Sequence, residues 1–331
     1  MPLEGTVGLS SALGYVTESV WGTSVAPAAW TEWLPGESMG RKQNYVTSNS
    51  MGNNQLFARS TRTAATTRKA EGAIPIEVPN KGFSSFLNLL HGKTVTPKKE
   101  VENAYVHTHE IGTTDPYKKS LTVVKAAPKV EGGTVDSYCY PGFILNSMDF
   151  ALATNGILLC TLNANAKDED QSQSIGTVAY PASVENYNFV QCVVKIGGAE
   201  QKFLRDFKLN IAKPTDTNRA FLGSATMAQP LTNAFSTGML ELTADYSNNT
   251  LYKMFEKNET KLVEILFTGA VAAGSEKFTL EFKIPVARFE GDSPNVENLG
   301  PLGQKIPLKI EYNGTEPPIT IVYKTLDVTI A

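Results

Sequence analysis

The sequence is poor in cysteine and histidine. Among 331 residues there are three of each, and Cys139, Cys160 and Cys192 show no CxxC spacing. An odd set of widely spaced cysteines indicates neither a disulfide framework nor a zinc site. We therefore expect the cysteines to be small, buried hydrophobic residues. His107 and His109 form the one local group that suggests a metal, but no carboxylate-rich signature lies nearby, so we interpret them as part of a solvated strand face.

A charge excess and long apolar runs are also missing. Thirty basic and 33 acidic residues give a net charge of −3, which provides no electrostatic basis for holding DNA tightly. No stretch approaches the roughly 18 consecutive apolar residues of a membrane helix. Residues 1–10 lack the basic and apolar regions of an export signal. We therefore expect neither membrane insertion nor signal-directed export.

The motifs of common enzyme classes are absent as well. GxSxG, the P-loop, HExxH and GxGxxG do not occur, which removes the support for common hydrolases, NTPases, zinc proteases and dinucleotide enzymes. The run Asp168, Glu169 and Asp170 resembles an acidic pair for glycoside hydrolysis, but such a run in a polar segment is more typical of a solvated linker. We expect no catalytic site, no metal and no cofactor.

Strand patterns dominate what is present. Short runs rich in Val, Ile, Leu, Phe and Thr recur between Gly, Pro, Asn and Asp, which predicts a mainly β protein. Residues 72–79 alternate with period two, and Pro75 is compatible with that strand only at an edge or bulge. Asn155-Gly156 predicts a hairpin between residues 142–153 and 156–163. Further strands are expected over residues 120–126, 189–196, 203–211, 238–244, 261–268, 277–286, 304–312 and 319–328.

The pattern repeats in the second half of the chain. An alternating strand beginning at Gly72 precedes a short predicted helix at 83–90, with Asn80 as its cap. An alternating strand beginning at Gly238 likewise precedes a short predicted helix near 251–255. The sequence therefore predicts two tandem domains, 1–170 and 171–331, each a β-sandwich or barrel with one short flanking α-helix.

Each half also contains a long polar segment without a hydrophobic period, Val46–Glu71 and Ala212–Thr237. We interpret both as loops. Four basic residues cluster in the first one, but no aromatic residues alternate with them to stack on bases, so contact with a neighbouring subunit is favoured over a nucleic-acid arm.

The order strand, long loop, strand, helix and further strands resembles the tail tube proteins of long-tailed bacteriophages. The stretches that are similar to that family are Gly14 to Thr23, Gly72 to Leu90, Tyr140 to Met148 and Phe203 to Leu209. The resemblance implies a tail-tube-like fold and a ring of six tube domains around a channel that conducts the genome. Family members often have one tube domain, whereas the repeat predicts two tail-tube-like domains in this chain. With two domains in one chain, a trimeric pseudo-hexamer is favoured over a hexamer of chains.

The resemblance also implies partners, and we assign the contact between stacked rings to the two long polar segments. The partners would be further copies of the chain, a tape-measure protein, a tail terminator and distal tail proteins, and genomic DNA would pass without sequence-specific binding. The protein would be made in the bacterial host cytoplasm and incorporated into the phage tail of the virion. The residues expected to contact the adjacent ring are Asn53, Arg59, Arg62, Arg68, Lys69, Thr217, Arg219 and Thr226.

Other functions stay open at this point. A receptor-binding β-sandwich and a phage head-decoration or capsid protein share the same composition, because a fold does not dictate a function. A glycosidase is the more distant alternative.

Overall fold

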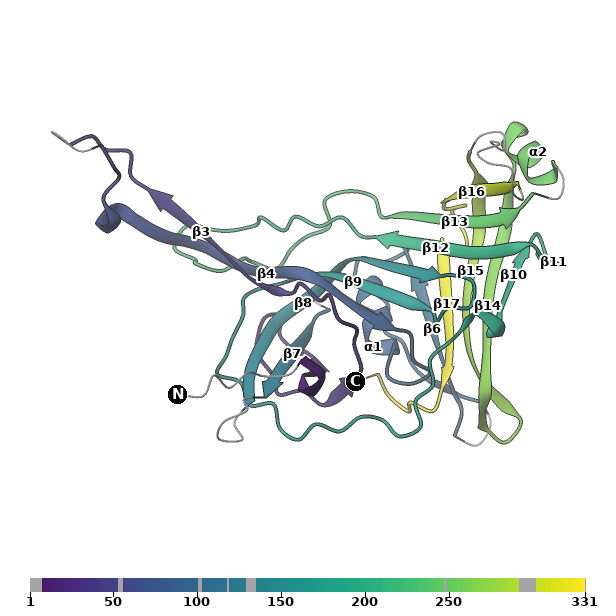
Figure 1. Cartoon of the computed structure of the whole chain (residues 1–331), viewed down its shortest axis with the longest axis horizontal. Helices are drawn as coiled ribbons and strands as arrows, with labels where there is room; N and C mark the ends of the chain where they lie inside the picture. The colour runs from purple at the N-terminus through teal and green to yellow at the C-terminus, as the bar shows by residue number, and fades with distance from the viewer. Residues whose placement is uncertain are drawn as a thin grey trace.

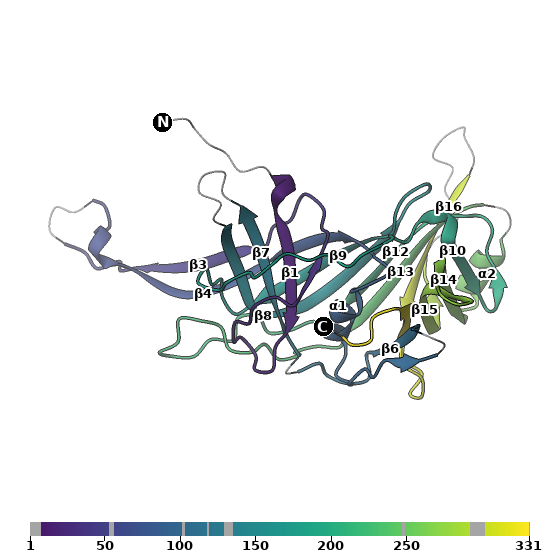
Figure 2. The ribbon, with the colours of Figure 1, turned by 90° about the horizontal axis from the view of Figure 1, so that it is seen from below.

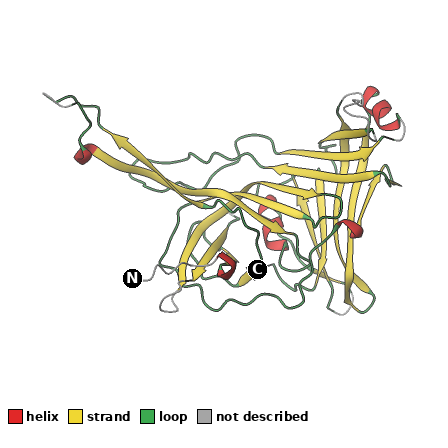
Figure 3. Ribbon diagram, in the orientation of Figure 1, coloured by secondary structure: helices red, strands yellow, loops and turns green. Residues whose placement is uncertain are grey.

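Antiparallel strands form nearly all of the regular structure, as Figure 1 and Figure 3 show, so the predicted mainly β class is confirmed. The computed structural model describes residues 8–52, 56–100, 103–117, 119–128, 135–246, 249–291 and 302–330. The elements of the first half are η1 (Gly8–Ser10), β1 (Ala12–Thr17), β2 (Ala29–Thr31), β3 (Gly40–Thr47), η2 (Ser60–Arg62), β4 (Thr63–Glu77), α1 (Ser84–Leu87), η3 (Asn88–Leu90), β5 (Lys98–Lys99), β6 (Tyr105–Ile111), β7 (Leu121–Pro128), β8 (Val135–Leu152) and β9 (Leu159–Ala166). Those of the second half are η4 (Phe189–Gln191), β10 (Cys192–Ile196), β11 (Ala199–Glu200), β12 (Leu204–Ala212), β13 (Thr237–Asp245), α2 (Thr250–Glu256), β14 (Thr260–Ala273), β15 (Glu276–Phe289), β16 (Gly303–Ile310) and β17 (Ile319–Thr325).

The strands follow the local sequence signals. The predicted hairpin joins β8 to β9, and Asn155 in its turn has a φ of 60°. Pro75 lies in β4 opposite Thr161 of β9. The Pro75 carbonyl points the other way and accepts a hydrogen bond from Leu34 N at 2.9 Å, outside any strand. In an antiparallel strand the nitrogen and the carbonyl of one residue face the same side, so the Pro75 nitrogen also faces away from β9. On that side β3 has already ended, and the missing N–H therefore removes no bond to β9.

Both predicted helices are present but short. The first consists of α1 and the 3₁₀ turn η3, and it begins after Phe83 rather than at Asn80. Asn80 is buried, and its side chain accepts a hydrogen bond from Glu185 N at 3.1 Å. The predicted cap at Asn80 is therefore wrong, because a contact with a distant segment uses its side chain.

One continuous sheet of eight strands crosses the molecule. Its order is β3-β4-β9-β8-β12-β13-β16-β15, and every neighbouring pair is antiparallel. The joint between the two halves of the chain is the pair β8–β12, in which Phe207 faces Leu152 and Ala212 faces Ser147. β3 pairs on one side with β4 and has an open edge on the other, whereas β15 is paired on both sides, with β14 on one side and with β16 and β17 on the other.

The order of strand pairing is the same in the two halves. It is β2-β1-β7-β8-β9-β4-β3 in the first half and β11-β10-β14-β15-β16-β13-β12 in the second. The sequence alignment of Gly72 with Gly238 agrees with this order. Ile74 of β4 faces Leu162 of β9, and Leu240 of β13 faces Leu308 of β16.

The halves also share strands and a core. Besides β8 with β12, β6 of the first half pairs with β17 of the second. One hydrophobic cluster includes buried side chains from both halves. The division into 1–170 and 171–331 therefore stays a prediction.

The eight-stranded sheet has one apolar face, which packs into the core. Phe150, Leu209 and Leu240 are fully buried on it. The ring of Phe150 meets those of Phe282 and Phe83 edge to face, with centroids 5.0 and 6.1 Å apart. Burying each such side chain contributes about 1.5–3 kcal/mol, so this face supplies much of the driving force for folding.

The opposite face of the sheet is polar. Asp149 of β8 accepts hydrogen bonds from Asn163 of β9 at 2.5 Å and from Asn210 of β12. Asn163 also donates to Ser147 Oγ at 2.8 Å. Because these side chains come from both halves, they fix the register of the β8–β12 joint.

The three histidines form one buried hydrogen-bonded chain. Nδ1 of His107 and Nε2 of His109 lie 2.7 and 2.8 Å from Ser84 Oγ, and Nε2 of His91 lies 3.0 Å from Nδ1 of His109. His107 Nε2 lies 2.8 Å from the carbonyl oxygen of Asp327. The expectation of a solvated strand face is therefore wrong, because α1 and the segment after β17 cover this face of β6.

The cysteines behave largely as expected. Cys139 and Cys160 are buried and Cys192 is half-buried, and all three are free thiols. The interpretation as small hydrophobic residues is confirmed for the first two.

The buried histidines predict acid sensitivity. Burial lowers the pKa of His91 from 6.5 to about 4, with help from Lys119 and Lys93, and burial also lowers the pKa of His107 and His109. The unfolded chain therefore binds protons between pH 6.5 and 4 that the folded chain excludes, so stability is full above pH 6.5 and falls toward pH 4. Urea unfolding should show a loss of about 2 kcal/mol from His91 alone between pH 7 and pH 5.

The matched variant is His91→Gln, which removes one titrating group from the chain. Its unfolding free energy should fall less steeply with decreasing pH than that of the wild type. Equal slopes for the two proteins would show that His91 does not carry the effect.

Candidate assembly site: the projecting arm and its base

β3 and β4 extend beyond the rest of the molecule as a two-stranded hairpin, which is seen in both Figure 1 and Figure 2. We call residues 40–70 the arm. The sequence predicts a loop over Val46–Glu71, and this prediction is wrong for residues 63–71, which belong to β4 and pair with β3.

Hydroxyl and amide side chains join the two strands of the arm where it has no hydrophobic core. The Oγ1 atoms of Thr47 and Thr63 lie 2.9 Å apart, and Asn44 Nδ2 donates to Thr67 Oγ1 at 3.0 Å. Thr66 Oγ1 donates to the Asn44 carbonyl at 3.2 Å. Threonine favours extended backbone, so the arm forms strands although its sequence shows no apolar alternation.

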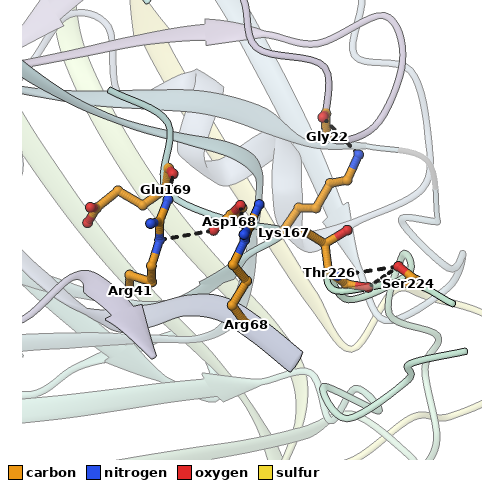
Figure 4. A network of polar contacts seen from close by, with 8 residues as sticks. All are labelled: Gly22, Arg41, Arg68, Lys167, Asp168, Glu169, Ser224 and Thr226. Atoms are coloured by element: carbon orange, nitrogen blue, oxygen red, sulfur yellow. Dashed lines mark hydrogen bonds and ion pairs between the residues drawn. The ribbon is translucent and has the colours of Figure 1, made fainter. Parts of the chain in front are cut away.

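Two arginines anchor the base of the arm to one carboxylate (Figure 4). Arg68 Nε lies 2.6 Å from Asp168 Oδ2, and Arg41 Nε lies 3.2 Å from Asp168 Oδ1. Arg41 also donates to the carbonyl of Glu169. The Asp168 side chain is only 15% exposed, so the acidic run is not a freely solvated linker at this position. It fixes the arm to the segment that follows β9.

The second long segment, residues 213–236, runs beside the arm base. Arg68 N donates to the Ala225 carbonyl at 2.9 Å, and Arg68 forms a parallel bridge with Thr226. Ser224 Oγ donates to the Thr226 carbonyl at 2.8 Å, which shapes this turn (Figure 4). The two long polar segments, which lie far apart in the sequence, therefore meet at Arg68.

The predicted contact residues occupy different places. Arg59 and Arg62 lie near the end of the arm, where Arg62 Nη1 donates to the Ser50 carbonyl at 3.3 Å. Lys69 forms an ion pair with Glu71 at 2.9 Å. Asn53 lies outside the described residues.

The remaining two predicted residues lie in the second segment. Thr217 borders an open depression that is also lined by Lys42 and Asn146. Arg219 donates to the Gln229 carbonyl at 2.9 Å and lies over the ring of Phe221, 5.3 Å from its centroid. The structure thus brings together Arg68 and Thr226 and distributes the other described residues along both segments.

The sequence analysis missed the apolar side chains of these segments. Leu56 and Phe57 near the end of the arm are 96% and 89% exposed, and Leu222 and Phe235 of the second segment are also nearly fully exposed. Large apolar residues within a polar, non-periodic segment were the available signal. Such side chains clustered on projecting segments are typical of protein contact surfaces.

Two features that would suggest other functions are absent from the described part of the chain. It contains no group of three or more His, Cys, Asp or Glu side chains arranged to hold a metal ion. None of its helices has the length and apolar character needed to cross a membrane.

Comparison with known families decides the class of protein. A family model described as phage tail tube protein matches residues 8–315. The chain belongs to the phage tail tube protein family. This tail tube protein has no match among the curated proteins. The family is structural, so the protein is a component of the phage virion that assembles with copies of itself into a tube.

The arm base yields a testable prediction for this tail tube protein. Asp168→Asn removes the charge shared by Arg41 and Arg68, and it should lower the free energy of unfolding by about 1 kcal/mol, since the arginines are partly exposed. Trypsin should cleave within the arm several-fold faster, as followed by mass spectrometry. Glu169→Gln is the matched control, because only its backbone carbonyl contacts Arg41. Equal cleavage of both variants would contradict this role for Asp168.

Proposed function

We propose that three copies of this tail tube protein form a closed ring, a pseudo-hexamer of six tube units, and that stacked rings form the channel through which the genome is delivered. Each chain would supply two tube units, residues 1–170 and 171–331. The repeated order of strand pairing in the two halves carries this proposal.

The β8–β12 joint supplies a model for the contact between chains. In this joint, β12 of the second half adds to the sheet of the first half through β8. β3 has the same place in the first half that β12 has in the second, and β15 corresponds to β8. We therefore propose that β3 of one chain, which has an open edge, joins its neighbour beside the C-terminal end of β15. Because β14 pairs with β15 as far as Arg288, the first residues of β14 would separate from β15 to admit the added strand.

Closing the ring in this way gives a barrel of three eight-stranded sheets. Barrels of about 16–18 strands already enclose water-filled channels, and barrel diameter grows with strand number. Three sheets of this size therefore leave an open lumen. Closed rotational symmetry also stops lateral growth after three chains.

The polar face of the sheet suits the channel wall, because the apolar face is buried in the core. It carries the hydrogen-bonded group of Asp149, Asn163 and Asn210. Polar side chains that are hydrogen-bonded to one another offer phosphate fewer contacts than free cations do, and phosphate contacts are what hold DNA to proteins. DNA would pass without sequence-specific binding.

The arm and residues 213–236 are proposed to contact the adjacent ring, because their exposed apolar side chains need a partner surface. Arg59, Arg62 and Arg219 would lie at that contact. We further propose a tape-measure protein, a tail terminator and distal tail proteins as partners, synthesis in the host cytoplasm, and no enzymatic activity. The family match favours this function over a head-decoration or receptor-binding protein.

The mass of an isolated ring tests the proposal. Native mass spectrometry of rings released from tubes at low protein concentration should give close to three times the chain mass of 35.9 kDa. A mass near six chains would remove the proposal that one chain supplies two tube units. A protein that stays a monomer at every concentration would overturn ring formation itself.

A backbone substitution tests the edge at β3. Gln43 faces Arg68, whose N–H points away from β3 to Ala225, so this is a non-hydrogen-bonded pair and the Gln43 N–H faces the open edge. Gln43→Pro removes that donor without removing a bond to β4, so it should abolish rings in electron micrographs while the subunit stays folded by circular dichroism. Gln43→Ala keeps the N–H and should form rings. Rings from both variants would exclude this edge from the contact.

A further inference from the structure

The two ends of β4 have contrasting surfaces. The end at Thr63 continues into the arm, where Leu56 and Phe57 are almost fully exposed. The other end, at Glu77, borders a cavity of about 400 Å³. We call this cavity the foot pocket; its lining includes Trp33, Leu34, Pro79, Tyr180 and Pro181.

The foot pocket offers an incoming group a mixed lining, in which aromatic and apolar side chains lie beside polar ones such as Thr31, Ser183 and Asn186. Trp33 and Leu34 are half-buried there, whereas Tyr180 is 44% exposed and lies on the segment that links the two halves. The floor is fixed, because Trp30 is 2% exposed. The pocket is therefore preformed and large enough for an aromatic side chain.

A smaller cavity lies at the corresponding place in the second half. It has a volume of about 250 Å³ and is lined by Phe203, Leu204, Ala244, Asp245 and Met254 among others. Ala244 and Asp245 end β13 as Glu77 ends β4, and residues 213–236 lead into the opposite end of β13. Both units thus place a projecting segment at one end of a strand and a cavity at the other.

Charge also matches between the arm and the foot pocket. Residues 40–70 contain no Asp or Glu, and their basic residues are Arg41, Lys42, Arg59, Arg62, Arg68 and Lys69. The foot pocket includes the carboxylates of Glu32 and Glu77. Its one basic side chain, Lys81, donates to the carbonyls of Ala182 and Ser183.

From these observations we propose that the apolar end of the arm, Leu56 and Phe57, docks into the foot pocket of a second copy of this chain in the adjacent ring. This inference rests on the proposed function, because it names the receiving surface for the contact between stacked rings.

The positions of the two surfaces favour a second copy over the chain's own pocket. Arm end and foot pocket lie beyond opposite ends of the same strand, so one molecule cannot join them. A contact between different surfaces of two identical molecules is head-to-tail, and such contacts repeat without closing. That is the geometry which axial growth of a tube requires.

Disulfide trapping between two single-cysteine additions tests the docking. Full-length chains carrying Phe57→Cys and Tyr180→Cys are mixed, assembled and oxidised, and should give a disulfide-linked dimer of the two variants. The native thiols contribute little background, since Cys139 and Cys160 are buried and burial raises the pKa of Cys192 to about 12. Val271→Cys replaces Tyr180→Cys in the control, because Val271 is exposed in the hairpin between β14 and β15.

The outcomes separate this inference from the proposed function. The docking is supported if tubes form and the yield of disulfide-linked dimer is at least tenfold higher with Tyr180→Cys than with Val271→Cys. Tubes in which Tyr180 cross-links no better than Val271 overturn the docking and leave ring stacking intact. A wild-type protein that forms neither rings nor tubes overturns the proposed function itself.

A second pair of variants removes dependence on cysteine geometry. Leu56→Ser with Phe57→Ser should leave folded rings that fail to stack, because serine is too small to fill the pocket and cannot pack against Trp33, Leu34 and Tyr180. Tyr180→Ser should likewise shorten the tubes, as measured from electron micrographs. Wild-type tube length in both variants contradicts the docking.

Discussion

Backbone pairing between β8 and β12 is the constraint on which the rest of the structure depends. Without it, each half would end in a row of unpaired N–H and C=O groups, which is an unstable arrangement for a strand in water and a site for indiscriminate association. The joint makes one eight-stranded sheet from two similar halves, and Asp149 with its two asparagine partners fixes its register. The buried histidine chain strengthens the same union from the other side of the core, since it ties β6 to the segment after β17.

Most of the strands could be predicted from the sequence, because they are half-buried. Residues 73–78 and 147–152 alternate since one face meets the core and the other is more exposed, and Asn155-Gly156 has few conformations other than a hairpin turn. The prediction of a loop over Val46–Glu71 was wrong for residues 63–71 for a related reason. A two-stranded arm buries neither face, so Thr and Ala stabilise it through backbone pairing and cross-strand hydroxyl contacts, which leave no hydrophobic period.

The candidate site was less predictable, because its contacts join distant parts of the chain. Arg68 was predicted to be a contact residue, but its partners Asp168 and Ala225 are far away in the sequence. No local sequence pattern predicts contacts between such distant residues. His107 and His109 were assigned to solvent for the same reason, since the helix that covers them comes from residues 84–87. The exposed Leu56 and Phe57 were detectable, because isolated large apolar residues in a polar segment are costly unless something covers them.

The two units of the chain are alike in strand order but not in what projects from them. Only the first carries a long two-stranded hairpin, whereas residues 213–236 of the second remain irregular and lie against its base. In a ring of three such chains, long and short projections would alternate around the rim. Successive rings could then lock together only at every third of a turn, so the tube would resist twisting and keep a fixed rotational phase along its length.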